Sequence, residues 1–452
     1  MIDEQALLST IIADPDDDRP RLLYADWLEE HGQRDRARLI RVQIELAHMP
    51  DNADDPGGLR AEEEQLEVAC EKTLPQLDGI EWGSFQRGLV CNVLPATPAA
   101  FQRHASVIGD MGSVHCVTFD NLDGFDVLAQ VSVLARFTEL YVHPDDQGEF
   151  RKGDPEHRFN DDLQAVLAST HCPRLRHLDL DTCQLGPRGA KALADCPWMG
   201  SLVDLDLLDN YIGDEGIAAL AASPYLTALR NLRIDLNNIG PAGIEALAAS
   251  VNLGGLEDLF IGELWLNKIG PAAGVALGRS PYLTHLRELK IHDWIEALGA
   301  EGIAHGPNLA GLTYLDLCTA SGPDAARALA ASPYLLQLKG LKLYGCDIGD
   351  EGAKALARSP VLATLEDLDL TYNELTDDGV QALAASPYLE RLKPGGLDIE
   401  SGNRLTADGL QALRARFGDR LYARTSSNPI EYTCDFQGQK AEPGAAADGG
   451  GR

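Results

Sequence analysis

The sequence predicts an α/β solenoid in which strand–turn–helix units stack into a parallel inner sheet and an outer row of helices, preceded by a small α-helical module. Two recurring sequence patterns support the predicted solenoid. A pattern of the form L-x-x-L-x-L-x-x-N recurs over residues 175–425, and an Ala-Leu-Ala motif follows most copies of it. The third observation is length, because 452 residues exceed what one compact core usually organises. Such self-similarity is the signature of a repeat architecture.

The period of the pattern is nearly constant. Residues 202–210 read LVDLDLLDN, and residues 365–373 read LEDLDLTYN. The first leucines of nine predicted repeats stand 26 or 27 residues apart, with one interval of 30, at residues 175, 202, 229, 256, 286, 312, 338, 365 and 392. The fourth copy has two possible registers, because Leu259 fits the first position as well as Leu256 does.

The last position of the pattern is where the chain leaves the strand. We expect an asparagine amide there to bind backbone groups that the turn leaves unpaired. This asparagine slot holds Asn210, Asn237, Asn267, Asn373 and Asn403. Cys183 and Cys346 fall in the same slot, which predicts a structural role for both thiols, and Trp294 and Ala320 occupy it in the fifth and sixth copies.

The region before residue 175 predicts a less regular continuation of the sheet. Residues 114–119 and 137–142 have the pattern of degenerate repeat strands, and residues 89–93 are predicted to begin the sheet. A polar insertion at about 143–160 precedes the regular array. In several units, a Ser-Pro-Tyr-Leu motif follows the helix, and its proline is predicted to end that helix.

Residues 1–48 predict a module of three short helices. Pro20 opens the second helix, Gly32 closes it, and the third runs from about Asp35 to Ala47. The core residues predicted from helical spacing are Leu7, Leu8, Ile11, Ile12, Leu22, Leu23, Trp27, Leu28, Leu39, Ile40, Ile44 and Leu46.

The predicted organisation has five parts. They are the helical module at 1–48, a linker and acidic helix at 49–80, an irregular cap with degenerate repeats at 81–174, regular repeats at 175–425, and a tail at 426–452 that is disordered from about residue 437. Within the helical module, we expect the charged residues to form ion pairs that hold the helices together. The basic partners are Arg21 and Arg36, and the acidic partners are Asp26 and Glu29.

Side chains alternate across a strand, so the non-leucine strand positions are predicted to face the concave side of the solenoid. The predicted partner-binding residues are Asp179, Asp181, Asp206, Asp209, Asp235, Asp316, Tyr314, Tyr344, Asp369 and Tyr372. The same face is predicted to carry His177, Arg233, Lys290, His292, Asp293, Lys342 and Asp398. We expect its carboxylates to lie in water with unshifted acid–base chemistry, which is poorly suited to catalysis.

The charge balance favours a basic protein as the partner. The formal net charge is −32, from 38 basic and 70 acidic residues. This charge repels phosphate backbones and gives no attraction to anionic membranes. Acidic side chains would steer a basic partner toward the face, and tyrosines would anchor it.

No enzyme chemistry is predicted. The sequence has no glycine-rich phosphate loop, His-Glu-x-x-His, Gly-x-Ser-x-Gly or EF-hand motif, so we expect no catalysis, no cofactor and no metal. The N-terminal MIDEQ has no basic residues ahead of an apolar segment, and nine cysteines show no Cys-x-x-Cys spacing. We therefore expect a cytoplasmic protein with reduced thiols, and a monomer.

Two resemblances extend these expectations. The Leu/Asn pattern, with 26–27-residue units and a helix in each, resembles the ribonuclease-inhibitor class of leucine-rich repeats. It implies a non-catalytic scaffold that binds through its concave face, and it leaves open an inhibitor of a basic enzyme or a regulator of the GTPase-activating type.

The second resemblance concerns the N-terminal part. RLLYADWLEEHG at 21–32, RARLIRVQ at 36–43 and FQRG at 85–88 closely resemble the bacterial repeat-companion domain. This resemblance implies a bacterial intracellular protein whose helical module accompanies the repeats, and it implies no activity. A further alternative is that this module recognises the partner and the repeats only present it.

Overall fold

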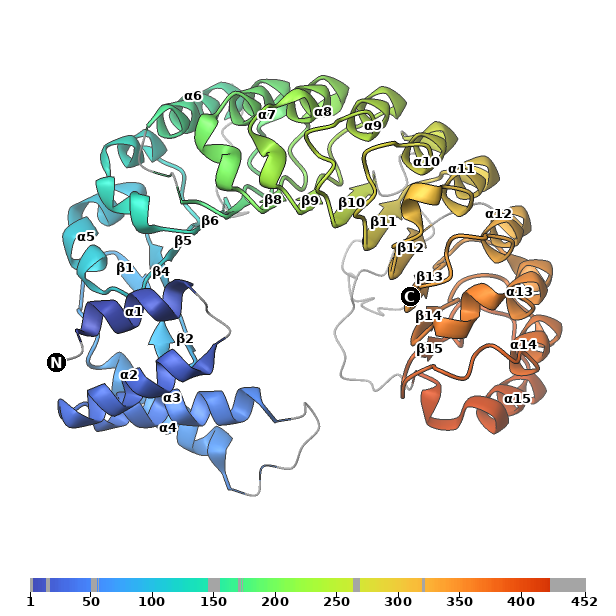
Figure 1. Ribbon diagram of the computed structural model, residues 1–452, viewed down its shortest axis with the longest axis horizontal. Coiled ribbons are helices and arrows are strands. Elements are labelled where there is room, and N and C mark those ends of the chain that lie inside the picture. Colours follow the sequence, from blue (N-terminus) through green and yellow to red (C-terminus); the bar gives the residue numbers. More distant parts are fainter. Residues whose placement is uncertain are drawn as a thin grey trace, which may run out of the picture.

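The computed structural model is an open arc, with strands along its inner side, helices along its outer side and the N-terminal helices at one end (Figure 1). This architecture confirms the predicted solenoid and its helical module. The structure describes residues 3–13, 17–49, 55, 57–144, 155–169, 172, 174–262, 269–318 and 322–422. Asn267, Ala320, most of the predicted linker after residue 49 and the predicted tail at 426–452 lie outside these residues.

Among the described residues, thirteen strands form one sheet that runs in chain order along the arc. Its strands are β1 (Ile80–Trp82), β4 (Asn92–Pro95), β5 (Cys116–Phe119), β6 (Glu139–Val142), β7 (His177–Asp179), β8 (Asp204–Asp206), β9 (Asn231–Arg233), β10 (Asp258–Gly262), β11 (Glu288–His292), β12 (Tyr314–Cys318), β13 (Gly340–Lys342), β14 (Asp367–Asp369) and β15 (Leu397–Asp398). All neighbours are parallel except β1, which runs antiparallel to β4. A parallel sheet needs crossover connections, and the helices of the outer row supply them.

The helices fall into two groups. The N-terminal group consists of the three helices of the predicted module, α1 (Glu4–Ala13), α2 (Asp18–Glu30) and α3 (Arg34–Ala47), and of the acidic helix α4 (Leu59–Glu71). The outer row consists of α5 (Pro98–Asp110), α6 (Pro155–Ala168), α7 (Gly186–Ala194), α8 (Gly213–Ala222), α9 (Pro241–Ala248), α10 (Gly270–Gly278), α11 (Glu296–Ala304), α12 (Gly322–Ala330), α13 (Gly349–Ala357), α14 (Asp377–Ala384) and α15 (Ala407–Phe417). Short 3-10 turns join several helices to the next strand. The end of the predicted polar insertion is thus part of α6.

The start of the sheet differs from the prediction. Strands β5 and β6 confirm the two degenerate repeat strands, but residues 89–93 do not begin the sheet. Strand β1 does so, while β3 (Leu89–Val90) pairs with β2 (Phe85–Gln86) in a separate hairpin. The turn between β2 and β3 contains Arg87 and Gly88, both with positive φ. A tight reversal at this point separates the hairpin from the strand that follows it.

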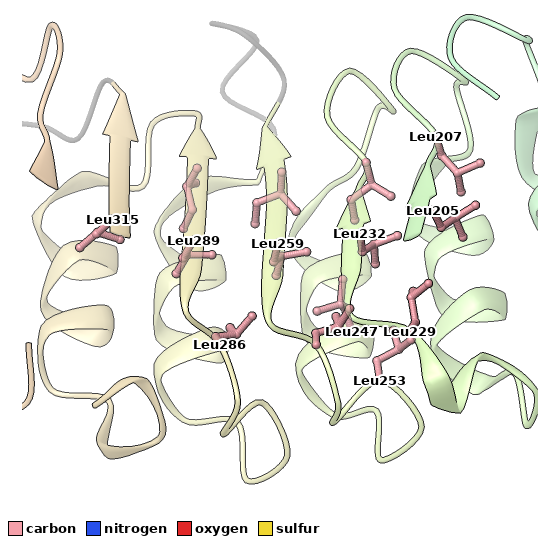
Figure 2. Close-up of a cluster of buried hydrophobic side chains, with 14 of the residues drawn as sticks. Leu205, Leu207, Leu229, Leu232, Leu247, Leu253, Leu259, Leu286, Leu289 and Leu315 are labelled. Carbon is pink, nitrogen blue, oxygen red and sulfur yellow. The ribbon is translucent and has the colours of Figure 1, made fainter. Parts of the chain in front are cut away.

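The repeat leucines form one continuous core between the sheet and the outer helices (Figure 2). Leu205, Leu232, Leu259 and Leu289 lie opposite one another on successive strands, and all are at most 4% exposed. This alignment settles the register of the fourth copy, in which Leu256 is the first leucine and Leu259 the second. The additional residues of that copy therefore follow β10.

The asparagine side chain in the slot forms hydrogen bonds with backbone groups of its own repeat and of the preceding repeat, as predicted. Asn237 accepts hydrogen bonds from the backbone nitrogens of Asn210 (3.1 Å) and Ile212 (3.2 Å), and it donates to the carbonyl oxygens of Leu207 (2.6 Å) and Asp235 (3.0 Å). The equivalent bonds are made by Asn210, Asn373 and Asn403. Each slot thus ties its turn to the preceding repeat.

The two slot cysteines are structural. The Cys346 thiol donates to the Leu317 carbonyl oxygen at 2.7 Å, and the Cys183 thiol donates to that of Val142 at 3.3 Å. Both are buried, and burial raises the pKa of the Cys183 thiol well above its ordinary value. A thiol that keeps its proton is a poor nucleophile.

In the fifth copy the prediction of Trp294 in the slot is wrong. Asp293 takes this position: it is fully buried, and its carboxylate accepts hydrogen bonds from the backbone nitrogens of Ile269 (3.2 Å) and Trp294 (2.6 Å). Trp294 is 46% exposed. The segment between the third apolar residue, Ile291, and the slot is one residue shorter here than in the other copies. Asp293 is therefore no part of the accessible concave surface.

In some neighbouring pairs of outer helices, an aspartate of one helix caps the N-terminus of the next. Asp214, in the first turn of α8, accepts hydrogen bonds from the backbone nitrogens of Gly240 (2.6 Å) and Gly243 (2.9 Å) at the start of α9. Asp350 caps α14 in the same way through Thr376 (2.8 Å) and Gly379 (3.0 Å). The free N–H groups at a helix N-terminus favour such an anion. This contact couples α8 to α9 and α13 to α14 on the outer side.

The N-terminal module confirms three predicted helices but not all of their buried faces. Helix α2 buries Tyr24, Ala25 and Leu28, whereas Leu22 and Leu23 are 40% and 53% exposed. Its buried stripe is therefore rotated from the predicted one, because Tyr24 fills the space between the helices. The predicted ion pairs are also wrong: the partner of Asp26 and Glu29 is Arg41, at 2.7 and 2.9 Å.

The module covers the hairpin that precedes the sheet. The buried Gln43 side chain of α3 donates to the Phe85 carbonyl oxygen at 3.2 Å and accepts from the Gly88 nitrogen at 2.5 Å. A Cβ on Gly88 would lie 2.5 Å from the Cα of Ile40, so only glycine permits this approach. The module thus closes the N-terminal end of the solenoid, which an array of stacked units requires.

Candidate functional site

The concave face carries two rows of side chains. The central row follows the second leucine of each repeat, from β7 to β15, and consists of Asp179, Asp206, Arg233, Phe260, Lys290, Asp316, Lys342, Asp369 and Asp398. The first row precedes that leucine and consists of His177, Asp204, Asn231, Asp258, Glu288, Tyr314, Gly340 and Asp367. In-register parallel strands place neighbours in a row about 4.8 Å apart.

The ten predicted binding residues do not form one uniform surface. Asp179, Asp206, Asp316 and Asp369 lie in the central row and Tyr314 in the first row, while the other five follow the strands, at Asp181, Asp209, Asp235, Tyr344 and Tyr372. Asp209 and Tyr372 stand in turns with positive φ. The predicted set therefore spans the strands and the loops along one rim of the sheet.

Two of the predicted aspartates are buried. Asp235 and Asp316 are 3% and 7% exposed. The Asp235 carboxylate binds Arg233 at 2.9 Å, and the Asp316 carboxylate lies 3.3 Å from the His292 imidazole. These two carboxylates hold neighbouring basic side chains and offer a partner little surface.

The middle of the face is a mixed cation–aromatic row. The sequence predicted four of its members, Arg233, Lys290, Lys342 and Tyr314, but not Phe260. The Phe260 ring lies 4.9 Å from the Arg233 guanidinium and 5.8 Å from the Lys290 ammonium. Lys290 and Lys342 lie 5.3 and 5.9 Å from the ring of Tyr314. Phe260 was missed because the fourth repeat has two registers by sequence. With Leu256 as its first leucine, Phe260 falls in the central row.

The three tyrosines among the predicted binding residues divide into a pair and a single residue. The rings of Tyr344 and Tyr372 lie 5.1 Å apart, beyond the ends of β13 and β14. Tyr314 instead lies between two lysines in the cation–aromatic row. A tyrosine ring offers a large contact area at low entropic cost.

The expectation of unshifted carboxylates is wrong. Burial raises the pKa of Asp206 to about 6. Burial also raises the pKa values of Asp181, Asp209 and Asp369. The physical cause is the loss of water around these carboxylates, which disfavours their charged form.

Two histidines accompany this acidic part of the face. His143 lies 3.0 Å from Asp179, and this hydrogen bond raises the pKa of the imidazole. His177 lies 3.9 Å from Asp204; burial lowers the pKa of His177, but Asp204, Glu139 and Asp179 together raise it, and the net shift is upward. Both imidazoles therefore gain positive charge at a higher pH than free histidine does.

The raised pKa of Asp206 predicts how stability changes with pH. Its pKa is about 6 in the folded protein against 3.8 for the unperturbed group, so the folded state binds the proton more tightly. This contribution to stability is complete below pH 3.8 and is lost as the pH rises to about 6. The substitution Asp206→Asn should therefore raise the free energy of unfolding at pH 8 by about 1 kcal/mol and leave it unchanged at pH 4.

Urea unfolding at pH 4 and pH 8 measures this difference. The exposed Asp123 offers a control, because Asp123→Asn removes the same charge from a surface position. A variant Asp206→Asn that is less stable than the wild type at pH 8 would contradict the prediction. In that case attraction to Arg233, 3.5 Å away, would outweigh the cost of burial.

No metal centre is evident in the described part of the chain, where no three histidine, cysteine, aspartate or glutamate side chains are grouped to hold an ion. Nor is any described helix long and apolar enough to cross a bilayer. The eight described cysteines are thiols, and all of them are buried. The surface chemistry that remains consists of carboxylates, cations and aromatic rings on the concave face.

Comparison with known proteins agrees with this architecture. A family model described as leucine-rich repeat matches residues 171–194, 201–221, 225–248, 338–357 and 361–384. The chain carries leucine-rich repeats. Proteins built from these repeats generally act as scaffolds for protein–protein interaction, and their concave surfaces are extended binding sites. No curated protein matches the chain.

Two solved structures are similar to this leucine-rich-repeat chain. One is an internalin (inlF) from Listeria monocytogenes, 18% identical, which covers 68% of this chain and 80% of that chain with a TM-score of 0.38. The other is from the Rad7 and Elc1 complex in yeast, 15% identical, which covers 95% of this chain and 96% of that chain with a TM-score of 0.45.

Proposed function

We propose that this leucine-rich-repeat protein is a non-catalytic scaffold that binds a basic protein through its concave face. The observation that carries the proposal is the charge of the two rows between β7 and β15. They hold three Lys or Arg residues, Arg233, Lys290 and Lys342, against nine carboxylates, Asp179, Asp204, Asp206, Asp258, Glu288, Asp316, Asp367, Asp369 and Asp398. The whole chain, at −32, adds to the attraction at longer range.

The raised pKa values support binding of a cation. A carboxylate that is costly to ionise in the free protein gains when a positive side chain arrives and compensates its charge. Asp206, Asp181 and Asp209 are such groups. The Tyr344–Tyr372 pair supplies aromatic contact area further along the same face.

The finer assignments belong to the same proposal. The outer helix in almost every repeat supports placement in the ribonuclease-inhibitor class, and the docking of α3 against residues 85–88 supports a companion role for the N-terminal module. We also propose that the protein is bacterial, cytoplasmic and monomeric. Nine cysteines without a Cys-x-x-Cys spacing support a reducing compartment.

Affinity capture with two matched variants tests the proposal. The concave variant carries Asp179→Asn, Asp204→Asn, Asp258→Asn and Asp367→Asn. The convex variant loses the same charge from exposed positions of α8, α9, α11 and α14 through Glu215→Gln, Glu245→Gln, Glu301→Gln and Asp378→Asn. Both variants have identical net charge, so only the place of the lost charge differs.

The expected result is a specific loss. Proteins from the native cell that bind the wild type at physiological salt should be rich in Lys and Arg, should bind the convex variant equally well, and should bind the concave variant about tenfold more weakly. Equal capture by all three proteins, or a loss confined to the convex variant, contradicts the proposal.

A further inference from the structure

Building on this function, we propose that a depression over β8–β11 is the anchor site for one arginine side chain of the basic partner. The depression has a volume of about 160 Å³ and lies where the first and central rows meet the cation–aromatic row. Its lining includes Asp204, Asp206, Asp258, Glu288 and the half-buried Phe260. The inference rests on the proposed function, since it names the chemistry that the partner must present there.

The charge inside the depression is incompletely compensated. Arg233 is held by Asp235 at 2.9 Å and lies 3.5 Å from Asp206, and Lys290 lies 3.5 Å from Glu288. Asp258, by contrast, forms no ion pair with any described residue. Burial raises the pKa of Asp258, and the neighbouring Glu288 and Glu257 raise it further. A further cation would therefore be stabilised at this point.

The register sets the shape of the cation that fits. Asp258 and Glu288 are direct partners on β10 and β11, so their carboxylates start from backbone positions about 4.8 Å apart. A planar guanidinium has five N–H donors in a rigid fork and can donate to both carboxylates at once. A lysine ammonium is a compact point charge with no such fork.

The aromatic part of the lining completes the site. Phe260 lies beside Asp258 on the same strand, two residues further along. Its ring already accepts two cations of this chain, which shows that its surroundings favour positive charge. An incoming arginine would place its aliphatic stem against this apolar surface while its guanidinium reaches the carboxylates. Asn231 and Asp204, which are hydrogen-bonded to each other, close the neighbouring edge.

Two peptides of equal charge, hexa-arginine and hexa-lysine, test this inference by isothermal titration against the full chain at physiological salt. The wild type should bind hexa-arginine about tenfold more tightly, which is the order that one additional charge-assisted hydrogen bond contributes. The variant Asp258→Asn with Glu288→Gln should bind both peptides equally. The control Asp367→Asn with Asp398→Asn removes the same charge from β14 and β15 and should keep the tenfold preference.

The outcomes separate this inference from the function on which it rests. Equal affinity of the wild type for the two peptides, or a preference that survives Asp258→Asn with Glu288→Gln, overturns the arginine anchor. If both double variants then weaken both peptides alike, the acidic face still binds cations and the proposed function stands. If neither peptide binds the wild type, the proposed function fails together with the anchor.

Discussion

Replacing Asn237 with alanine should lower the free energy of unfolding by about 4 kcal/mol, because it leaves several buried backbone groups without partners at about 1–3 kcal/mol each. The Asn237 side chain is fully buried and makes four hydrogen bonds to backbone of its own and the preceding repeat. In a solenoid each repeat is stabilised by its neighbours, so the loss also weakens the coupling between the two units.

Urea unfolding followed by circular dichroism measures this effect. Asn252→Ala is the matched control, since Asn252 makes a single long hydrogen bond, 3.4 Å, to the Ala222 carbonyl oxygen at the surface. It should change the free energy of unfolding by less than about 0.5 kcal/mol. If Asn237→Ala and Asn252→Ala have the same free energy of unfolding, the hydrogen bonds of Asn237 do not stabilise the turn as proposed.

The second large effect is expected at Gly278, where an added methyl group destabilises a helix that alanine would ordinarily favour. A Cβ on Gly278 would overlap the Gly302 carbonyl oxygen and lie 2.6 Å from its carbon. Both belong to the backbone of α11, which cannot rotate aside as a flexible side chain would. Gly278→Ala must therefore push α10 and α11 apart, and we expect a loss of about 3 kcal/mol.

The sign of this result is informative, because glycine to alanine in an exposed helix usually stabilises a protein by about 1 kcal/mol. Gly311→Ala is the control: the nearest atom to its Cβ would be the Leu286 carbonyl oxygen at 3.6 Å, an ordinary contact. Thermal unfolding should show a lower Tm for Gly278→Ala alone. A Tm equal to or above that of the wild type contradicts the close packing of these helices.

The electrostatic character of the site followed only in part from the sequence. The alternation of side chains along each strand placed Asp179, Asp206 and Asp369 on the inner face, and the structure agrees. Their surroundings could not be foreseen, because the water that reaches a side chain depends on strands 26 or 27 residues away along the chain. Burial by these neighbouring strands raises the pKa values of Asp206 and Asp369.

The same limit explains the residues that were misplaced. Asp293 replaces Trp294 in its slot because one residue fewer separates strand from turn, and only the hydrogen bond to Ile269 reveals which side chain points inward. In the helical module, Arg41 reaches Asp26 because α2 and α3 pack side by side. Phe260 belongs to the site because the pairing of β10 with β9 and β11 fixes which of the two registers the fourth copy adopts.

The sequence by itself determined the strand–helix alternation, the repeat period, the buried leucines and the asparagine slot, because these follow from a local pattern that each unit repeats. The tertiary structure alone decided the antiparallel start of the sheet, the glycine contact between α10 and α11, and the pairing of charges on the concave face. The physical reason is that these features depend on contacts between different units, whose geometry no single repeat encodes.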